Sequence, residues 1–247
     1  MPVEEIEEAR RNLSEDIFNA EYNADFVTFA GRAYYPFDAR THCAPLQYNP
    51  RAPLCFSFDY NVEPGCSVIS QEQTLPNGVL GTGVIGEVWI PRNSSTPAVC
   101  RRLIQDWGHH PGQVYVYSDA TGGARGSARV LGSDIELVKN ELRPVFGDRI
   151  HFRIPPANPP ERVRVNAMNS RLKAADGTIR LMVDPMKAPH VIRDLEGVQL
   201  LDGGSGEIDK KANPELSHIS DALGYLVAKE FPISNNKIVV GRAHYGP

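Results

Sequence analysis

Hydrophobic positions follow two different spacings in the first 90 residues. Apolar side chains recur at helical spacing over residues 4–26, with Glu and Arg between them, and predict one amphipathic helix. Three apolar, β-prone runs follow at 54–60, 66–73 and 84–90, and Pro, Gly and Asn mark the short turns between them. Strands joined by such short turns are typical of an antiparallel meander.

Beyond residue 90 the spacing alternates between helix and strand. The predicted elements are, in order, a helix that opens at 94–97 and ends before 108, a strand at 113–117, a helix at 134–146, a strand at 149–154, a helix at 159–175, a short strand at 178–183 and a last helix at 217–231. Residues 184–214 show no clear period, and we expect irregular structure there. This order predicts an α/β fold of the ribonuclease-H-like type: a mixed five-stranded central sheet flanked by helices, with an extra β-hairpin before the last helix.

Composition places the chain among soluble globular proteins. It has 247 residues, of which 41% are hydrophobic and 23% charged. No run of 18 apolar residues is present, so we expect no membrane span, and the acidic N-terminal segment lacks the apolar core of a secretory signal. The four cysteines have no CxxC spacing, which favours buried free thiols over disulfides or a zinc site.

Charge is distributed unevenly along the chain. The formal net charge is −4, which as an average argues mildly against nucleic-acid binding. Residues 1–40 are acidic, however, whereas residues 139–193 hold eleven bases and five acids. Such a basic segment could place a positive surface beside an acidic site, although solvated helix faces explain it equally well.

Two predicted strands carry an acid at or near their ends. Asp59 interrupts the apolar stretch CFSFDYN, and Asp119 follows VYVYS and precedes a loop rich in Gly, TGGARGS. If the first and fourth strands are parallel neighbours, both acids lie at the carboxyl end of the sheet, where α/β folds bind ligands. Each could equally be an Asp that caps its own turn. The loop lacks the Gly-Lys-Ser/Thr ending of a Walker A motif, but Arg125 and its backbone N–H groups suit a phosphate.

The last predicted helix carries His218 and Asp221 on one face, three residues apart. They could join a metal site, or simply be favoured by the start of the helix and a local partner. Glu87 and Asp209 are further candidate ligands, although ordinary surface roles are commoner for such acids. A site built from Asp side chains, without Cys and with little His, selects Mg²⁺ or Mn²⁺ over zinc. Two such ions about 4 Å apart could support hydrolysis of a phosphodiester.

The motifs taken together resemble a known family. FSFDYNVEPG, VYVYSDATGGARGS and HISDALGYL, in this order, are similar to the nuclease domain of the large terminase subunit of tailed double-stranded-DNA bacteriophages, in the ribonuclease-H-like, or integrase, superfamily. The stretches RVRVNAMNSRLKAADGTIRLMVDP and HVIRDLEG also resemble that family in the region before its final acid. The similarity runs from about residue 15 to residue 232.

This resemblance implies a metal-dependent endonuclease that cuts concatemeric viral DNA, with low sequence specificity, during genome packaging. It implies that Asp59, Asp119 and Asp221 are catalytic and hold two Mg²⁺ or Mn²⁺ ions, with His218 as a further ligand. The implied partners are double-stranded DNA, the terminase ATPase domain, the small terminase subunit and the portal, in the cytoplasm of the infected bacterial host. Basic side chains are expected to contact DNA phosphates, namely Arg125, Arg153, Arg162, Arg164, Arg171, Lys173 and Arg180.

The sequence departs from the full-length family pattern because it has no P-loop, so we do not expect translocation from this chain itself. We expect an excised or separately encoded domain: residues 1–30 as an N-terminal helix and linker remnant, 31–232 as the nuclease domain and 233–247 as a tail. Two other functions stay open at this point: a junction-resolvase or transposase-type nuclease on the same fold, and a non-catalytic docking module of a packaging motor.

Overall fold

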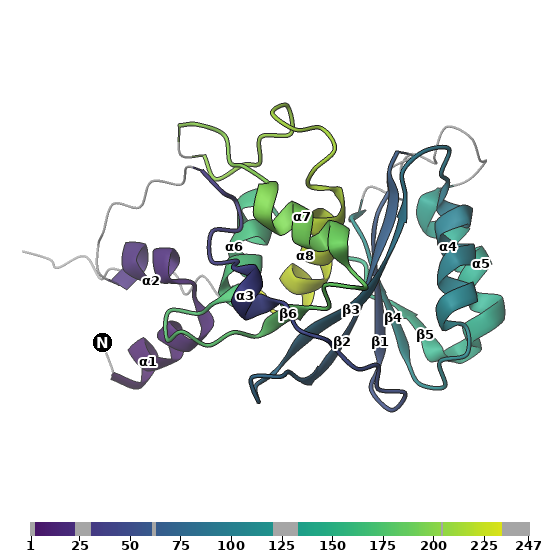
Figure 1. The fold of residues 1–247 in the computed structure, drawn as a ribbon, viewed down its shortest axis with the longest axis horizontal. Helices are drawn as coiled ribbons and strands as arrows, with labels where there is room; N and C mark the ends of the chain where they lie inside the picture. The colour runs from purple at the N-terminus through teal and green to yellow at the C-terminus, as the bar shows by residue number, and fades with distance from the viewer. Residues whose placement is uncertain (1–2, 23–30, 61–62, 121–132, 204, 234–247) are drawn as a thin grey trace, which may run out of the picture.

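A computed structural model describes residues 3–22, 31–60, 63–120, 133–203 and 205–233. Its centre is a six-stranded sheet with the strand order β5-β4-β1-β2-β3-β6 (Figure 1). The strands are β1 (Leu54–Asp59), β2 (Gly65–Thr74), β3 (Leu80–Ile90), β4 (Val114–Tyr117), β5 (Ile150–Phe152) and β6 (Leu181–Val183). β1, β2 and β3 form the predicted antiparallel meander, while β4 joins β1, β5 joins β4 and β6 joins β3 in parallel.

The ribonuclease-H-like α/β class is confirmed, with two differences in detail. The sheet has six strands instead of five because residues 181–183 pair in parallel with β3. The region before the last helix holds a helix, α7 (Pro189–Gly197), and the predicted hairpin is reduced to one antiparallel bridge between Leu200 and Ile208. Two backbone hydrogen bonds flank this bridge, from the Leu201 N–H to the Glu207 carbonyl and from the Asp209 N–H to the Gln199 carbonyl, both at 2.8 Å.

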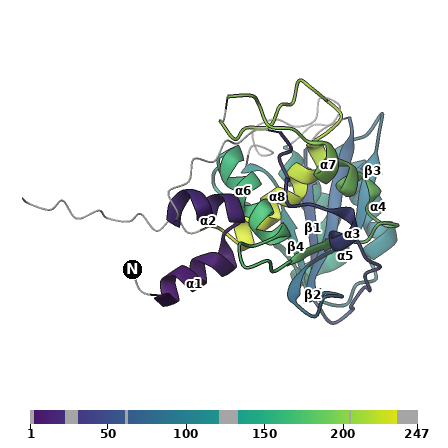
Figure 2. The same cartoon turned by 60° about the vertical axis from the view of Figure 1, so that its left-hand side comes forward.

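Helices cover both faces of the sheet. The remaining helices are α1 (Val3–Asn12), α2 (Glu15–Tyr22), α3 (Ala39–His42), α4 (Thr96–Trp107), α5 (Asp134–Phe146), α6 (Glu161–Leu172) and α8 (His218–Glu230), with a short 3-10 turn at Gly147–Arg149. α4 and α5 lie on one face, and α6, α7 and α8 lie on the other (Figures 1 and 2). None of the described helices is both long and apolar enough to cross a membrane.

The alternation of side chains along β1 assigns its residues to these two faces. Leu54, Phe56 and Phe58 belong to the core under α4 and α5, whereas Cys55 belongs to the core under α6, α7 and α8. Because successive side chains of a strand point to opposite faces, Asp59 shares the face of Cys55. The strand therefore presents its acid to the side that α8 covers.

The N-terminal region differs from the single helix predicted for residues 4–26. α1 and α2 are separate because the chain leaves the helix at Leu13 and Ser14 to bond with the last turn of α6 and the segment after it. The Ser14 N–H donates to Ser170 Oγ at 2.9 Å, and the Ala175 N–H donates to the Leu13 carbonyl at 2.8 Å. This pairing ties α1 and α2 to the end of α6.

α7 lies within the region expected to be irregular. Its first turn is held from outside, because the Glu87 carboxylate on β3 accepts the backbone N–H groups of His190 and Val191 at 3.1 Å. The side chain of the residue before the helix, Ala188, cannot cap it. A helix of nine residues whose cap comes from a distant strand leaves little local signal in the sequence.

Candidate active site

The carboxyl ends of β1 and β4 lie next to each other. The two strands are parallel, and the last pair in their register joins Ser57 to Tyr117. Asp59 and Asp119 each follow two residues later in their own segment, where neighbouring strands are about 4.8 Å apart. The predicted parallel pairing of the first and fourth strands is thus confirmed, and it brings both acids to the same end of the sheet, where these strands terminate.

α8 adds the second half of the site by packing across β1 and β2. Its first residue, His218, has Nδ1 3.3 Å from Asp59 Oδ2 and Nε2 3.1 Å from the Pro214 carbonyl oxygen. The fold therefore brings two predicted site residues, 159 positions apart in sequence, into direct contact.

Asp221 lies one turn further along α8 and is held by two cations. Its side chain is 3% exposed. Arg164 Nη2 donates to Oδ1 at 2.6 Å, and Lys210 Nζ donates to Oδ2 at 3.0 Å. Both cations also lie near Glu161 Oε1, at 3.5 and 3.3 Å respectively. We call these four residues the ion-pair quartet; its two positive and two negative groups leave no net charge.

The surroundings of Asp59 and His218 raise the pKa of both side chains and so favour a proton held by the pair. Burial raises the pKa of Asp59, whose side chain is 14% exposed, and the negative charge of Asp221 raises it further against the opposing effect of His218. The pKa of His218 is raised mainly by its hydrogen bond to Asp59. A cation placed beside Asp59 would relieve both the desolvation and the repulsion between carboxylates.

Tyr225 lies beyond Asp221 on α8 and contacts Arg164. It follows Asp221 by one turn of α8, and the Arg164 guanidinium lies 4.7 Å from the centre of its ring. Burial raises the pKa of Tyr225, and the negative charges of Asp59, Asp221 and Asp119 raise it as well.

The donor chemistry fits a hard divalent cation, but the site is not preassembled for one. Carboxylate oxygens are the ligands that Mg²⁺ and Mn²⁺ prefer. Within the described part of the chain, however, no three His, Cys, Asp or Glu side chains converge as a metal-binding group. Both oxygens of Asp221 already accept from Arg164 and Lys210. A metal ion approaching Asp221 would meet the positive charge of both side chains.

Asp194 on α7 supports the site but was not predicted from the sequence. Its side chain is fully buried, and its Oδ2 accepts the Ser220 N–H at 3.1 Å. The residue before α8, Ser217, has φ of 80° and makes no capping bond with its side chain, so Asp194 supplies the cap from a neighbouring helix. Burial raises the pKa of Asp194 to about 6.

A signal for Asp194 was present in the sequence. It stands three residues after Val191 and one before Leu195, both buried, so the acid lies on the apolar face of an amphipathic helix. An acid at such a position is uncommon without a specific partner.

Both candidate fourth ligands hold backbone groups of nearby segments. Glu87 anchors the start of α7 and contacts His190 Nδ1. Asp209 Oδ1 accepts the backbone N–H groups of Lys211 and Ala212 and so stabilises a turn. The surface role favoured from the sequence is wrong for Glu87, whose side chain is buried, whereas Asp209 is partly exposed.

The predicted DNA-contacting residues fall into different environments. Arg125 lies outside the described residues. Arg162 and Lys173 are exposed, and Arg153 is partly exposed, pairs with Glu230 at 3.0 Å and lies over the ring of Tyr115. Arg180 is partly exposed and donates to the Arg11 carbonyl oxygen at 2.8 Å.

Arg164 and Arg171 are placed differently, because both are buried. Arg164 belongs to the ion-pair quartet, and Arg171 pairs with Glu72 at 2.9 Å and stacks on Phe231. Their burial is at odds with the expected phosphate contacts and favours structural roles.

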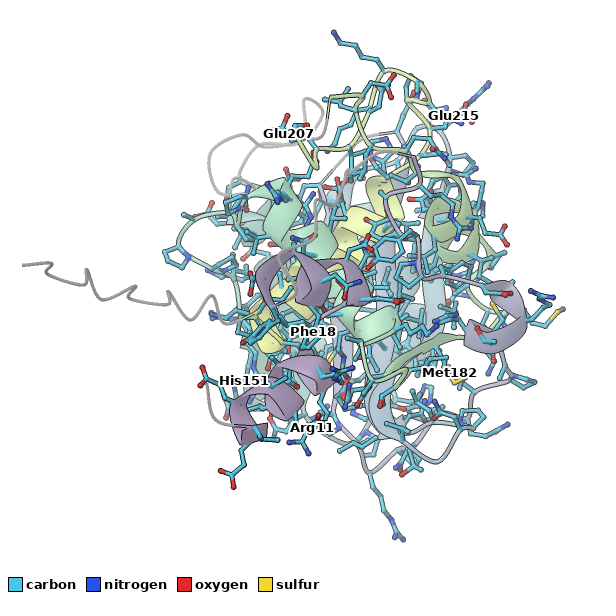
Figure 3. The ribbon with its side chains drawn as sticks, turned by 90° about the vertical axis from the view of Figure 1, so that its left-hand side faces the viewer. Arg11, Phe18, His151, Met182, Glu207 and Glu215 are labelled. Carbon is cyan, nitrogen blue, oxygen red and sulfur yellow. The ribbon has the colours of Figure 1, made fainter. Side chains whose placement is uncertain are left out.

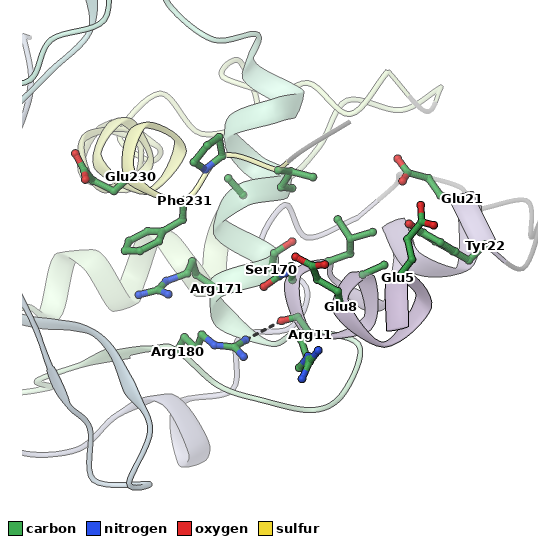
Figure 4. A pocket seen from close by; sticks show the side chains of 16 residues that line it. Glu5, Glu8, Arg11, Glu21, Tyr22, Ser170, Arg171, Arg180, Glu230 and Phe231 are labelled. Atoms are coloured by element: carbon green, nitrogen blue, oxygen red, sulfur yellow. Dashed lines mark hydrogen bonds between the residues drawn. The ribbon is translucent and has the colours of Figure 1, made fainter. Parts of the chain in front are cut away.

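A separate cavity of about 450 Å³ lies between α1, α2, the end of α6 and the end of α8 (Figure 4). Arg171 and Arg180 line one part of it, and Glu5, Glu8 and Glu21 line another. None of the predicted catalytic residues lines this cavity, so it is distinct from the candidate active site.

Comparison with solved structures identifies the fold. The large terminase from a thermophilic bacteriophage, in complex with ATP-gamma-S, matches 93% of this chain with a TM-score of 0.65 at 15% sequence identity. A second crystal form of that protein matches 92% of this chain with a TM-score of 0.63 at 17% identity. The chain has the large-terminase fold. It spans about half the length of the thermophilic-phage protein, covering 53% and 51% of the two structures.

The nuclease domain of the large terminase g2p from bacteriophage SPP1, with bound Mn, is more distant in structure. It matches 72% of this chain, and this chain covers 86% of it, with a TM-score of 0.45 at 14% identity. No protein-family model and no curated protein matches the sequence. The match to the thermophilic-phage protein confirms by structure the resemblance found in the motifs, as a large-terminase fold.

Proposed function

We propose that this chain is a metal-dependent DNA endonuclease of the large-terminase type, which cuts concatemeric viral double-stranded DNA during genome packaging. The observation that carries the proposal is the contact between His218 and Asp59 at the carboxyl ends of two parallel strands. Asp119 ends the neighbouring strand segment, and Asp221 lies one turn along the same helix as His218. This arrangement fits the acids of a phosphodiester hydrolase on a ribonuclease-H-like sheet.

The chain's own residues would hold and orient the reacting groups. Asp59 and Asp119 would bind one Mg²⁺ or Mn²⁺ ion, and Asp221 with His218 would bind a second. Bound ions of this kind activate water and stabilise the leaving oxygen of an in-line displacement. Before metal binds, the His218 contact orients the Asp59 carboxylate, and a ring nitrogen of His218 would have to give up its present partner, Asp59 or the Pro214 carbonyl, to become a ligand. The Asp194 bond to Ser220 holds the first turn of α8 in place.

DNA would bind through its phosphates, with little sequence preference. The accessible basic residues suited to this contact are Arg153, Arg162, Lys173 and Arg180, and Arg125 is kept as a candidate on its sequence context alone. Because each phosphate contact releases counterions, binding should weaken steeply as salt concentration rises.

The biological setting is part of the proposal. Residues 31–232 would form the nuclease unit, preceded by a linker at 1–30 and followed by a tail at 233–247. The ATPase that drives DNA into the capsid would be a separate domain or chain, and the small terminase subunit and portal would be further partners. The reaction would take place in the cytoplasm of the infected bacterial host.

A cleavage assay tests this function. Purified protein is incubated with supercoiled plasmid and linear duplex in Mn²⁺, in Mg²⁺ and in excess EDTA. We expect cutting with metal and none with EDTA. Asp59→Asn, Asp119→Asn and Asp221→Asn should each lower the rate by about 100-fold or more, because each removes a charged ligand oxygen.

The control is Asp148→Asn, which removes an exposed acid from the basic segment and should cut at the normal rate. Equal cutting in EDTA and in metal would contradict the mechanism. A four-way junction cut much faster than linear duplex would instead favour a junction-resolvase function.

A further inference from the structure

The two cations that bind Asp221 reach it from different places. Arg164 projects from α6, its side chain is 6% exposed, and its guanidinium also stacks on Tyr225. Lys210 projects from the segment between α7 and α8, and its side chain is 55% exposed. Glu207 and Glu215 of this segment lie at the edge of the molecule (Figure 3). The arginine is thus part of the core, while the lysine reaches inward from the surface.

This difference determines which ion pair can open. Moving Arg164 away would break its contacts with Tyr225 and Glu161 and leave a guanidinium buried without its partner. Moving Lys210 away returns a strongly hydrated ammonium on a flexible stem to water. Lys210 is therefore the cation that can leave Asp221 at lower cost.

The ammonium also lies close to a carboxylate oxygen that would bind a metal ion. Its nitrogen lies 3.0 Å from Asp221 Oδ2 and 3.3 Å from Glu161 Oε1, and its positive charge acts on Asp59 as well. An ammonium and a divalent cation repel each other at such short range. As long as Lys210 stays in place, its ammonium balances part of the negative charge of Asp221 and Glu161.

We propose that Lys210 is the counter-ion of Asp221 in the metal-free protein and that it leaves this carboxylate when a divalent cation binds. This inference rests on the proposed metal-dependent function and adds an exchange step to it. No covalent bond is made or broken, since one cation replaces another on the same oxygen. The affinity of the site for metal is then set partly by Lys210.

The first test compares Mn²⁺ binding by isothermal titration calorimetry in the wild-type protein, Lys210→Met and Lys211→Met. Methionine keeps much of the side chain's length and removes the charge. Lys211→Met removes the same charge one residue away, where the side chain is exposed. We expect the Kd of Lys210→Met to fall about tenfold and that of Lys211→Met to change by less than about twofold. Equal Kd values for the two variants would overturn the proposal.

The second test detects the release directly. The wild-type protein is treated briefly with an amine-acetylating reagent, with and without saturating Mn²⁺, and labelling of Lys210 and Lys211 is measured by mass spectrometry. We expect Mn²⁺ to raise labelling of Lys210 severalfold and to leave Lys211 unchanged. In Asp221→Asn, Lys210 should already label rapidly without metal. Unchanged labelling of Lys210 at saturating Mn²⁺ would show that the ammonium stays in place.

The outcomes separate this proposal from the proposed function. If Mn²⁺ binds and DNA is cut while Lys210 stays protected, only the exchange step fails. If no variant binds Mn²⁺ and no DNA is cut, the exchange and the proposed nuclease function fail together.

Discussion

The two faces of the central sheet bury different kinds of side chain although they share the same strands. Under α4 and α5 the core is made of aromatic and aliphatic side chains, with Phe56 and Phe58 from β1 at its centre. Under α6, α7 and α8 the interior also contains Asp194, Asp221 and Arg164, each nearly inaccessible. Burying charges costs free energy unless each is paired, whereas burying apolar surface stabilises the fold. Both faces therefore stabilise the fold through apolar burial, and the second face also buries the charged residues of the candidate site.

The largest effect should come from the apolar face. Phe56→Ala removes a fully buried ring that packs edge-on against Phe146. We expect the free energy of unfolding to fall by about 4 kcal/mol, measured by chemical denaturation. The neighbouring Ser57, on the opposite face, is also fully buried but has a hydroxyl without a hydrogen-bond partner among the described residues. Ser57→Ala should change stability by less than about 1 kcal/mol. Similar losses for both variants would contradict the division between faces.

The next effect should come from breaking the buried ion pair. Arg164→Met leaves Asp221 with only Lys210 as a cationic partner, and we expect a loss of about 3 kcal/mol in the free energy of unfolding. Asp221→Asn added to this variant should recover part of the loss, because the unpaired negative charge is gone. A double-mutant cycle measures this coupling. Strict additivity of the two changes would show that the pair is not coupled.

A smaller effect of opposite sign is expected at Asp194. Its pKa is raised by burial to about 6, so the folded protein binds this proton more tightly than the unfolded chain. Stability from this group is present at pH 4 and is lost as pH rises towards 6 and above. Asp194→Asn keeps an oxygen acceptor for Ser220 and removes the charge. It should be more stable than wild type by roughly 2 kcal/mol at pH 7, with little difference at pH 4.

This pH dependence can be measured by thermal or chemical unfolding of the two proteins between pH 4 and 8. Because other acids titrate in the same range, the difference between variant and wild type is the relevant quantity. A variant less stable than wild type at pH 7 would show that the charge of Asp194 stabilises α8 more than its burial costs.

The sequence predicted the fold best where signals are local. A continuous apolar, β-prone run predicted β1, and Ser95 and Pro97 predicted the start of α4, where Ser95 Oγ accepts the Ala98 N–H. α7 was missed because its anchoring oxygens belong to Glu87, about 100 residues earlier. β6 was recognised as a strand, but its partner could not be inferred, since three residues carry no information about pairing.

The candidate site was likewise predictable only where its signals are local. Strand ends and helical spacing identified Asp59, Asp119, His218 and Asp221 as candidates without the structure. The partners that control these residues come from tertiary packing: Arg164 and Lys210 reach Asp221 from two other segments. Charge counts along the chain could not distinguish a buried, paired arginine from one available to DNA.

The proposed divalent-metal site on the charged face of the sheet can be tested by anomalous X-ray diffraction from crystals soaked in Mn²⁺. We expect an anomalous peak within ~2.5 Å of carboxylate oxygens of Asp59 and of Asp119 or Asp221, with the Lys210 ammonium moved away from Asp221. Well-ordered carboxylates without such a peak, or a peak bound only elsewhere on the molecule, would contradict it.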